Sequence, residues 1–253
     1  MTEPLDGARA KLRRASDTLD ELFKQIQQAG ASRSYGFSLR VEQRYGVEDL
    51  VVRALIPQPL LDHVSAVAGE IVGDIRTTFD DAVWEMVSDP VEGKTAFPVF
   101  GDETGGEDGD YDIEGVAMIE GIDPEAASII KSVQPFGPNK AWDPMFVVHE
   151  LWKISKERPL MTGVGYLQGM TLVYKSPDGT SDSSKFVKVP PDVKDGDELF
   201  RDRRPLDKEV TGEGALLDII FEEETVRGQQ VAPLLKTLIM FTDDVLNALA
   251  KTV

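Results

Sequence analysis

The chain contains no cysteine, and histidine is almost as scarce, with two residues in 253. The absence of cysteine excludes disulfides, thiolate nucleophiles and cysteine-ligated metals. His63 and His149 lie far apart, and neither has a Glu three residues before it or a second histidine four residues away. These are the ligand spacings of di-iron carboxylate and zinc helices, so we expect no metal site.

Nucleotide motifs and long apolar runs are also missing. The sequence has no Walker A motif, no glycine fingerprint between a strand and a helix, and no G-x-S-x-G elbow, so we expect no cofactor. The glycines of Gly163-Val164-Gly165 lie in a strand pattern, which favours close backbone packing. No segment approaches the roughly 18 apolar residues of a membrane span, and the N-terminus lacks a signal-peptide pattern. The expectation is a soluble, cytoplasmic protein that does not engage a membrane.

Cations are scarce relative to anions. The chain has 27 Lys and Arg against 45 Asp and Glu, a formal net charge of −18. Phosphate binding needs clustered cations, so this charge disfavours a nucleic-acid partner and leaves a protein partner or a homo-oligomer as the expectation.

The stretch 101–115 concentrates the negative charge. From Asp102 to Glu114 it holds seven carboxylates and no cation, so we predict a solvated acidic loop. An EF-hand loop that began at Asp110 would have Gly121 in its twelfth position, where a bidentate acid is needed, so a calcium site fits less well.

Apolar residues at three-and-four spacing predict a long core helix from Gln58 to Val87. An amphipathic helix over 6–28 should end at Gly30. Asp-Pro pairs predict N-caps for two shorter helices, and a further amphipathic stretch predicts a closing helix. These three helices are expected over 123–133, 145–156 and 231–253.

Alternating apolar residues predict a β-hairpin over 35–44 and 48–56, around Tyr45-Gly46-Val47. Similar patterns predict strands over 162–175, 185–189 and 215–222, whereas 190–214 is interpreted as a polar excursion. The predicted fold class is α+β in one compact domain, 1–253. It combines a bundle of the first, long and last helices with the hairpin and a small antiparallel sheet.

A polar line follows the long helix, formed by Glu70, Asp74, Asp81 and Glu85 with Arg76 and Asp80 beside it. Acids in such a line repel one another unless they are solvated or meet cations. Two interpretations remain open: an exposed acidic face, or a semi-buried cluster. In the second case the expected cations are Lys153, Lys156 and Arg158.

Three segments resemble a family of bacterial proteins of about this length that has no assigned function. They are GEIVGDIRTTFDDAVWEM (69–86), SIIKSVQPF (128–136) and DPMFVVHELWKISKERPL (143–160). The first block of that family is similar to the R-x4-6-H signature of HEPN domains, helical bundles of ribonuclease toxins and defence systems. By this resemblance Arg76 matches the phosphate-positioning arginine and Asp80 a neighbouring aspartate, while Asp81 stands where the histidine is expected. In the third block, His149 and Glu150 match the family pattern.

The leading hypothesis is a non-enzymatic or catalytically degenerate HEPN-like protein that acts by protein interaction. One alternative hypothesis is a metal-independent ribonuclease centred on Arg76, with His149 in place of the missing histidine. Another is an acidic structural or binding protein that engages a basic partner. Arg76, Asp80, Asp81, His149 and Glu150 are the candidate site residues, with none assigned a catalytic role.

Overall fold

The computed structural model describes residues 5–31, 36–100, 111–136, 143–166, 170–176, 183–188, 194–204, 209–213 and 217–253. Most of the acidic loop predicted at 101–115 lies outside these residues. Its last five residues, Tyr111–Gly115, form a π-helical turn.

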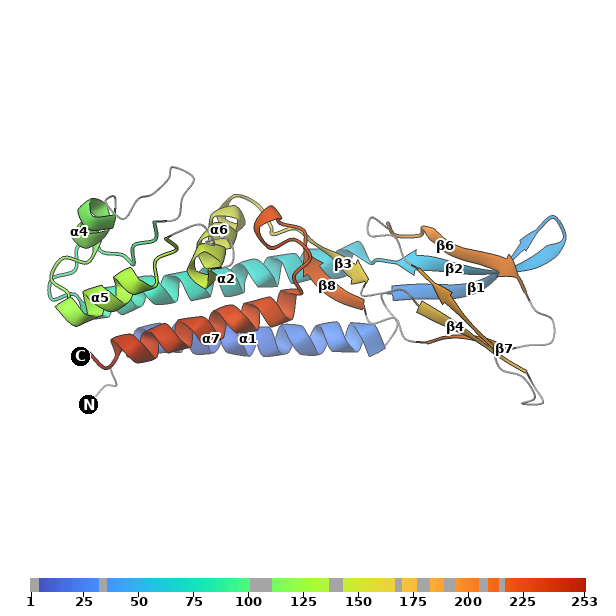
Figure 1. The fold of residues 1–253 in the computed structure, drawn as a ribbon, viewed down its shortest axis with the longest axis horizontal. Helices are drawn as coiled ribbons and strands as arrows, with labels where there is room; N and C mark the ends of the chain where they lie inside the picture. The colour runs from blue at the N-terminus through green and yellow to red at the C-terminus, as the bar shows by residue number, and fades with distance from the viewer. Residues whose placement is uncertain are drawn as a thin grey trace. The chain divides into compact units, whose positions relative to one another are not determined.

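The fold is α+β, as predicted, with helices and small antiparallel sheets (Figure 1). The helices are α1 (Asp6–Ala31), α2 (Gln58–Met86), α4 (Val116–Met118), α5 (Pro124–Ser132), α6 (Pro144–Glu157) and α7 (Val231–Leu249), with a 3-10 turn, η3, at Glu224–Val226. The strands are β1 (Gly36–Arg44), β2 (Val47–Leu55), β3 (Thr162–Tyr166), β4 (Met170–Lys175), β5 (Ser183–Val187), β6 (Glu198–Arg203), β7 (Glu209–Glu213) and β8 (Leu217–Phe221).

The chain divides into two compact units. The helical unit contains Met1–Phe23, His63–Met161 and Phe221–Val253, and the β unit contains Lys24–Asp62 and Thr162–Ile220. Two compact units can belong to one domain or to two, so the single-domain expectation stays a prediction.

In the helical unit, α1, α2 and α7 pack side by side, as expected for the first, long and last helices (Figure 1). Each helix buries one apolar stripe, because residues three and four apart share a helix face. The fully buried residues Ala15 of α1, Ile75 of α2 and Leu235 of α7 illustrate these stripes. The rings of Phe79 and Phe241 join α2 to α7 with a centroid separation of 6.3 Å.

The helix boundaries follow local chemistry. The Asp123 carboxylate accepts a hydrogen bond from the Glu125 N–H, and Asp143 accepts from Met145 and Phe146, so both Asp-Pro pairs are N-caps as predicted. The predicted end of the first helix at Gly30 is wrong, because α1 continues to Ala31.

In the β unit, two three-stranded sheets share a small core. Their strand orders are β1-β2-β6 and β5-β4-β7, and β3 pairs with β8 in a separate two-stranded sheet. Leu50 and Val52 of the first sheet form a buried cluster with Leu172 and Val187 of the second. The single strand predicted over 162–175 is therefore two strands that belong to different sheets.

Close packing explains Gly165 of β3, as the sequence suggested. A Cβ atom on Gly165 would lie 2.5 Å from the Ile220 side chain of β8. Only a residue without a side chain fits such an approach.

The stretch 190–214, interpreted as a polar excursion, contains strands β6 and β7. Charged residues of β6 are compatible with a strand because they pair across the sheet. Arg201 donates hydrogen bonds to Glu42 at 2.8 Å, to Asp49 at 3.1 Å and to Glu198. Hydrogen bonds from Arg53 and Arg201 lower the pKa of Glu42 to about 2.

The predicted hairpin is confirmed, with Gly36 opposite Leu55 and Arg44 opposite Val47. Its turn is one residue shorter than predicted, because Val47 is the first residue of β2. Tyr45 and Gly46 both have positive φ, 51° and 77°, as a two-residue type I′ turn requires.

Gly46 and Gly73 give opposite predictions for the same substitution. Gly46→Ala should lower the free energy of unfolding by about 1 kcal/mol, because a Cβ disfavours the left-handed conformation. Gly73→Ala should raise it by about 0.5–1 kcal/mol, because Gly73 lies inside α2 with open space around the added methyl. Urea denaturation followed by circular dichroism measures both, and a stabilising Gly46→Ala would contradict the turn assignment.

Candidate functional site

The guanidinium of Arg76 lies inside the helical unit, with the residue only 6% exposed. Its Nη1 donates to the Asp80 carboxylate at 2.6 Å, and its Nη2 donates to the Phe97 carbonyl at 3.0 Å. The two residues lie one helical turn apart on α2, so their side chains meet on the same face. Arg76 is therefore held by partners within the chain.

Asp80 completes a clamp on the segment that follows α2. The same Oδ1 atom that binds Arg76 accepts a hydrogen bond from the Phe97 N–H at 3.0 Å. Arg76 and Asp80 thus bind the carbonyl and the N–H of one residue, whose ring packs 4.8 Å from that of Phe79. This arrangement holds the segment around Phe97 against the core.

Asp81 is separated from this clamp by its own partner. Lys11 of α1 binds its carboxylate at 2.7 Å. Two turns earlier on α2, Asp74 accepts hydrogen bonds from Nε and Nη2 of Arg14 on α1. Glu85 accepts the Ala8 N–H at 3.0 Å, at the N-terminal end of α1 where a negative charge is stabilising.

Of the two interpretations of the polar line, the semi-buried cluster describes Asp74, Asp80 and Asp81, and Glu70 is exposed. The expected source of cations was wrong. Lys11 and Arg14 come from α1, whereas Lys153 of α6 binds Glu150 at 3.1 Å and Arg158 binds Glu223. Sequence spacing could not choose between these cations, because the choice depends on which helix packs beside each turn of α2.

His149 lies on α6 with its Nδ1 atom buried and without a hydrogen-bond partner among the described residues. Burial, followed by the positive charges of Arg76 and Lys153, lowers the pKa of His149 to about 4. The imidazole is therefore neutral at pH 7 and poorly suited to donate a proton as a general acid. Its ring packs at a 39° angle to the Trp152 ring, with centroids 5.8 Å apart.

Trp152 connects α6 to the Arg76 clamp, a role that sequence reasoning missed. The Arg76 Cζ lies 5.2 Å from the Trp152 ring centroid, and the Lys156 Nζ lies 4.0 Å from it. Both distances fit cation–π contacts. The sequence feature that could have indicated this role is an aromatic residue in the same amphipathic helix as His149.

Glu223 is a buried acid that the sequence did not single out. It is 2% exposed and binds Arg158 through two hydrogen bonds of 2.7 and 2.8 Å, and it accepts the Met161 N–H at 2.6 Å. Burial raises the pKa of Glu223, but the bonds from Arg158 and Met161 outweigh it and hold the pKa below its ordinary value. This pair lines a cavity of about 750 Å³ beside α6.

The structure therefore brings Arg76 and Asp80 together, with His149 close enough to feel the charge of Arg76. Asp81 and Glu150 have other partners. Among the described residues, no group of three or more His, Asp or Glu side chains could hold a metal ion. The hypothesis that these residues form a site stays a prediction.

Arg76→Ala should lower the free energy of unfolding by about 3–5 kcal/mol, because it leaves Asp80 and the Phe97 carbonyl without their buried partner. The matched control is Arg14→Ala, whose 64% exposed side chain should contribute less than about 1 kcal/mol. Urea denaturation measures both variants. Equal, small losses would contradict the clamp.

The depressed pKa of His149 predicts a pH-dependent stability. Between pH 6.5 and 4 the unfolded chain binds a proton at this residue that the folded chain does not, so stability should fall as pH falls through that window. An NMR titration of the two histidines, with His63→Gln to assign the signals, should place the His149 midpoint near pH 4. A midpoint near 6.5 would mean that the ring is solvated.

No helix among the described residues is long and apolar enough to cross a membrane.

Comparison of the sequence with protein-family models, with curated proteins and with solved structures finds no match in any of the three. The resemblance to HEPN-like proteins therefore stays a prediction, and the functional argument depends on the geometry of the Arg76 clamp.

Proposed function

We propose that this protein is a non-catalytic, HEPN-like protein that acts by protein interaction. The observation that carries the proposal is the state of Arg76, which is 6% exposed and binds both Asp80 and the Phe97 carbonyl. An arginine that positions a substrate phosphate needs an accessible guanidinium with free N–H groups. Here both terminal nitrogens serve the fold.

The position of the expected histidine supports the same conclusion. Asp81 stands there, and its carboxylate pairs with Lys11. An anion cannot replace an imidazolium beside a phosphate, because like charges repel one another. The ion pair instead joins α2 to α1 and serves the packing of the helical unit.

The global charge also supports a protein partner over RNA. At −18, the long-range field of the chain opposes the approach of a phosphate backbone. Lys11, Arg14 and Arg76 each bind an acid on α2, so their positive charges are largely neutralised there.

A metal-independent ribonuclease centred on Arg76 and His149 is the alternative. The placement of α6 beside α2 favours it, because Trp152 lies over Arg76 and His149 feels the charge of that arginine. It would require Arg76 to leave Asp80 and Phe97 when substrate binds.

An RNA-cleavage assay separates the two functions. We expect the wild type to cleave no faster than buffer, and His149→Gln to match it, because both terminal nitrogens of Arg76 are already bound within the chain. His149→Gln is preferred to Arg76→Ala because His149 has no hydrogen bond at Nδ1 to lose. Cleavage by the wild type that His149→Gln abolishes would overturn the proposal and establish the nuclease.

A further inference from the structure

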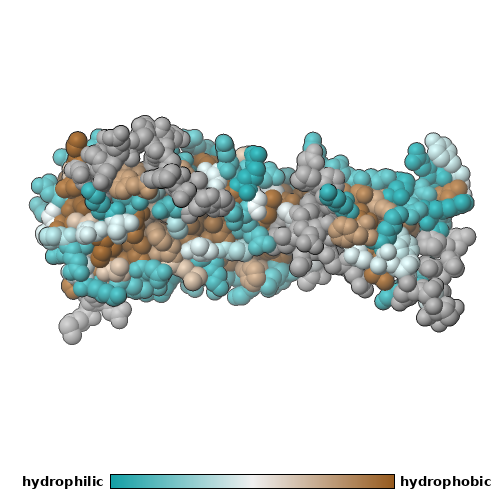
Figure 2. All heavy atoms as spheres, in the orientation of Figure 1, coloured by the Kyte–Doolittle hydropathy of each residue, from teal (hydrophilic) through white to brown (hydrophobic). Residues whose placement is uncertain are grey.

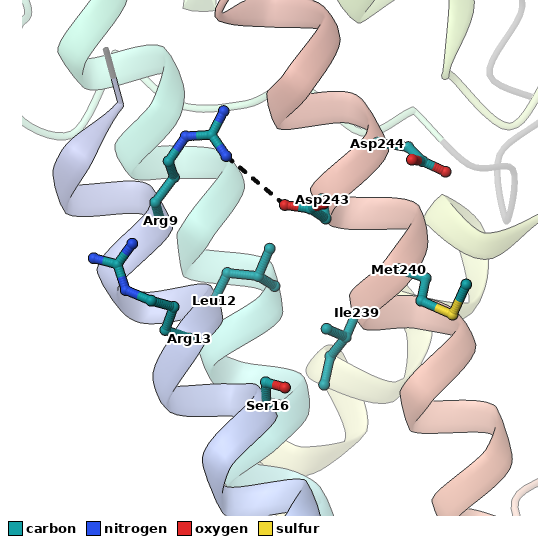
Figure 3. A pocket seen from close by; sticks show the side chains of 8 residues that line it. All are labelled: Arg9, Leu12, Arg13, Ser16, Ile239, Met240, Asp243 and Asp244. Atoms are coloured by element: carbon teal, nitrogen blue, oxygen red, sulfur yellow. Dashed lines mark ion pairs between the residues drawn. The ribbon is translucent and has the colours of Figure 1, made fainter. Parts of the chain in front are cut away.

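A groove runs between α1 and α7 on the helical unit, with a volume of about 370 Å³ (Figure 3). Leu12 of α1 and Ile239 of α7 lie between the two helices and form its apolar floor. Met240 borders the groove on α7 and is 59% exposed. Figure 2 shows hydrophobic residues gathered along one face of the helical unit between hydrophilic borders.

The two walls of the groove carry opposite charges. Arg9 and Arg13 line it on α1, and Asp243 and Asp244 line it on α7. Arg9 is used within the chain, where it donates to Asn247 at 2.9 Å and lies 3.8 Å from Asp243. Among the described residues, Arg13 and Asp244 have no ion-pair partner, and both are exposed.

Figure 3 places these two residues on opposite outer sides of the groove. Arg13 extends from the side of α1 that is turned away from α7, and Asp244 extends from the far side of α7 beside Met240. Their orientation leaves each charge available to a group outside the chain.

We propose that this groove is the interface of a homodimer in which α1 of one copy packs on α7 of the other. The inference depends on the proposed interaction function and identifies the partner as a second copy of the chain. The charge pattern supplies the argument, because the surface is complementary to itself: a basic wall and an acidic wall lie on either side of an apolar floor.

The same pattern selects the direction of the two-fold axis. If the axis ran across the helices, α1 would face α1 and the arginines of the two copies would repel one another. If it runs along the groove, α1 faces α7 of the partner subunit, and Arg13 of each copy faces the acidic wall of the other. The basic wall of each copy then meets the acidic wall of the other, so the same contact forms twice, as an isologous interface requires.

The area of the face formed by α1 and α7 determines how tightly two copies should associate. The 19 residues of α7 make a helix about 28 Å long, and two adjacent helices are roughly 20 Å wide. Such a face offers roughly 560 Å² per copy, below the roughly 800 Å² of a standard stable interface. The dimer should therefore be reversible at micromolar concentrations.

Charge reversal tests the arrangement by sedimentation equilibrium over a concentration series. The wild type should form a dimer, and Arg13→Glu and Asp244→Arg should each raise the dissociation constant at least tenfold. The double variant should return it to within about threefold of the wild type, because reversing both walls restores complementarity. The controls are Lys94→Glu and Asp89→Arg, at exposed positions outside the groove. They change the net charge by the same amounts and should leave the dissociation constant unchanged.

Three outcomes would overturn the dimer: a monomeric wild type at every concentration, single reversals that match their charge controls, or a double variant as weak as the singles. A groove that binds an unlike protein would give the first of these. The result is independent of the cleavage assay, because His149-dependent cleavage would overturn the non-catalytic proposal and leave the sedimentation result standing. Circular dichroism of each variant confirms that the helical unit remains folded.

Discussion

Burial of the Arg76 guanidinium is the constraint around which the helical unit is arranged. A guanidinium cannot lose its proton in a protein, so removing it from water requires compensating partners. Asp80 supplies a charge and the Phe97 carbonyl supplies an acceptor, while the Trp152 ring covers the guanidinium. These partners come from α2, from the segment after it and from α6, so satisfying one charge fixes three parts of the chain.

The remaining acids of α2 are satisfied in a different way. Asp74 and Asp81 pair with Arg14 and Lys11, which are closely spaced in the first half of α1. Exposed or half-exposed pairs of this kind contribute little to stability individually. Together they specify which face of α1 meets α2, and hence where α1 meets α7. The proposed groove lies along that second contact.

The proposed function depends on the same interactions. In an HEPN-like nuclease, the polar line of the long helix would present cationic and imidazole groups to a phosphate. In this chain Asp81, which the resemblance aligns with the histidine, binds a lysine, and both terminal nitrogens of Arg76 bind groups within the chain. The charged side chains of this line therefore serve the packing of the helices. This is the physical basis for preferring an interaction function.

The sequence by itself determined the secondary structure in most places, because the deciding interactions are local. Apolar spacing identified α2, the Asp-Pro pairs identified the starts of α5 and α6, and Tyr45-Gly46 identified the hairpin turn. Arg76 and Asp80 lie four residues apart on one helix, a spacing that permits the ion pair found in the structure. The pairing of strands was harder to predict from the sequence. The stretch 162–175 is divided between two sheets. The polar segment that holds β6 forms a strand because Arg201 binds acids on β1 and β2.

Only the tertiary structure decided which distant residues meet. It decided that α1 supplies the cations for Asp74 and Asp81 and that Phe97 and Trp152 enclose Arg76. It also left Arg13 and Asp244 on opposite sides of a groove. Each of these depends on contacts between residues far apart in the chain, and neither composition nor periodicity carries information about which distant elements meet.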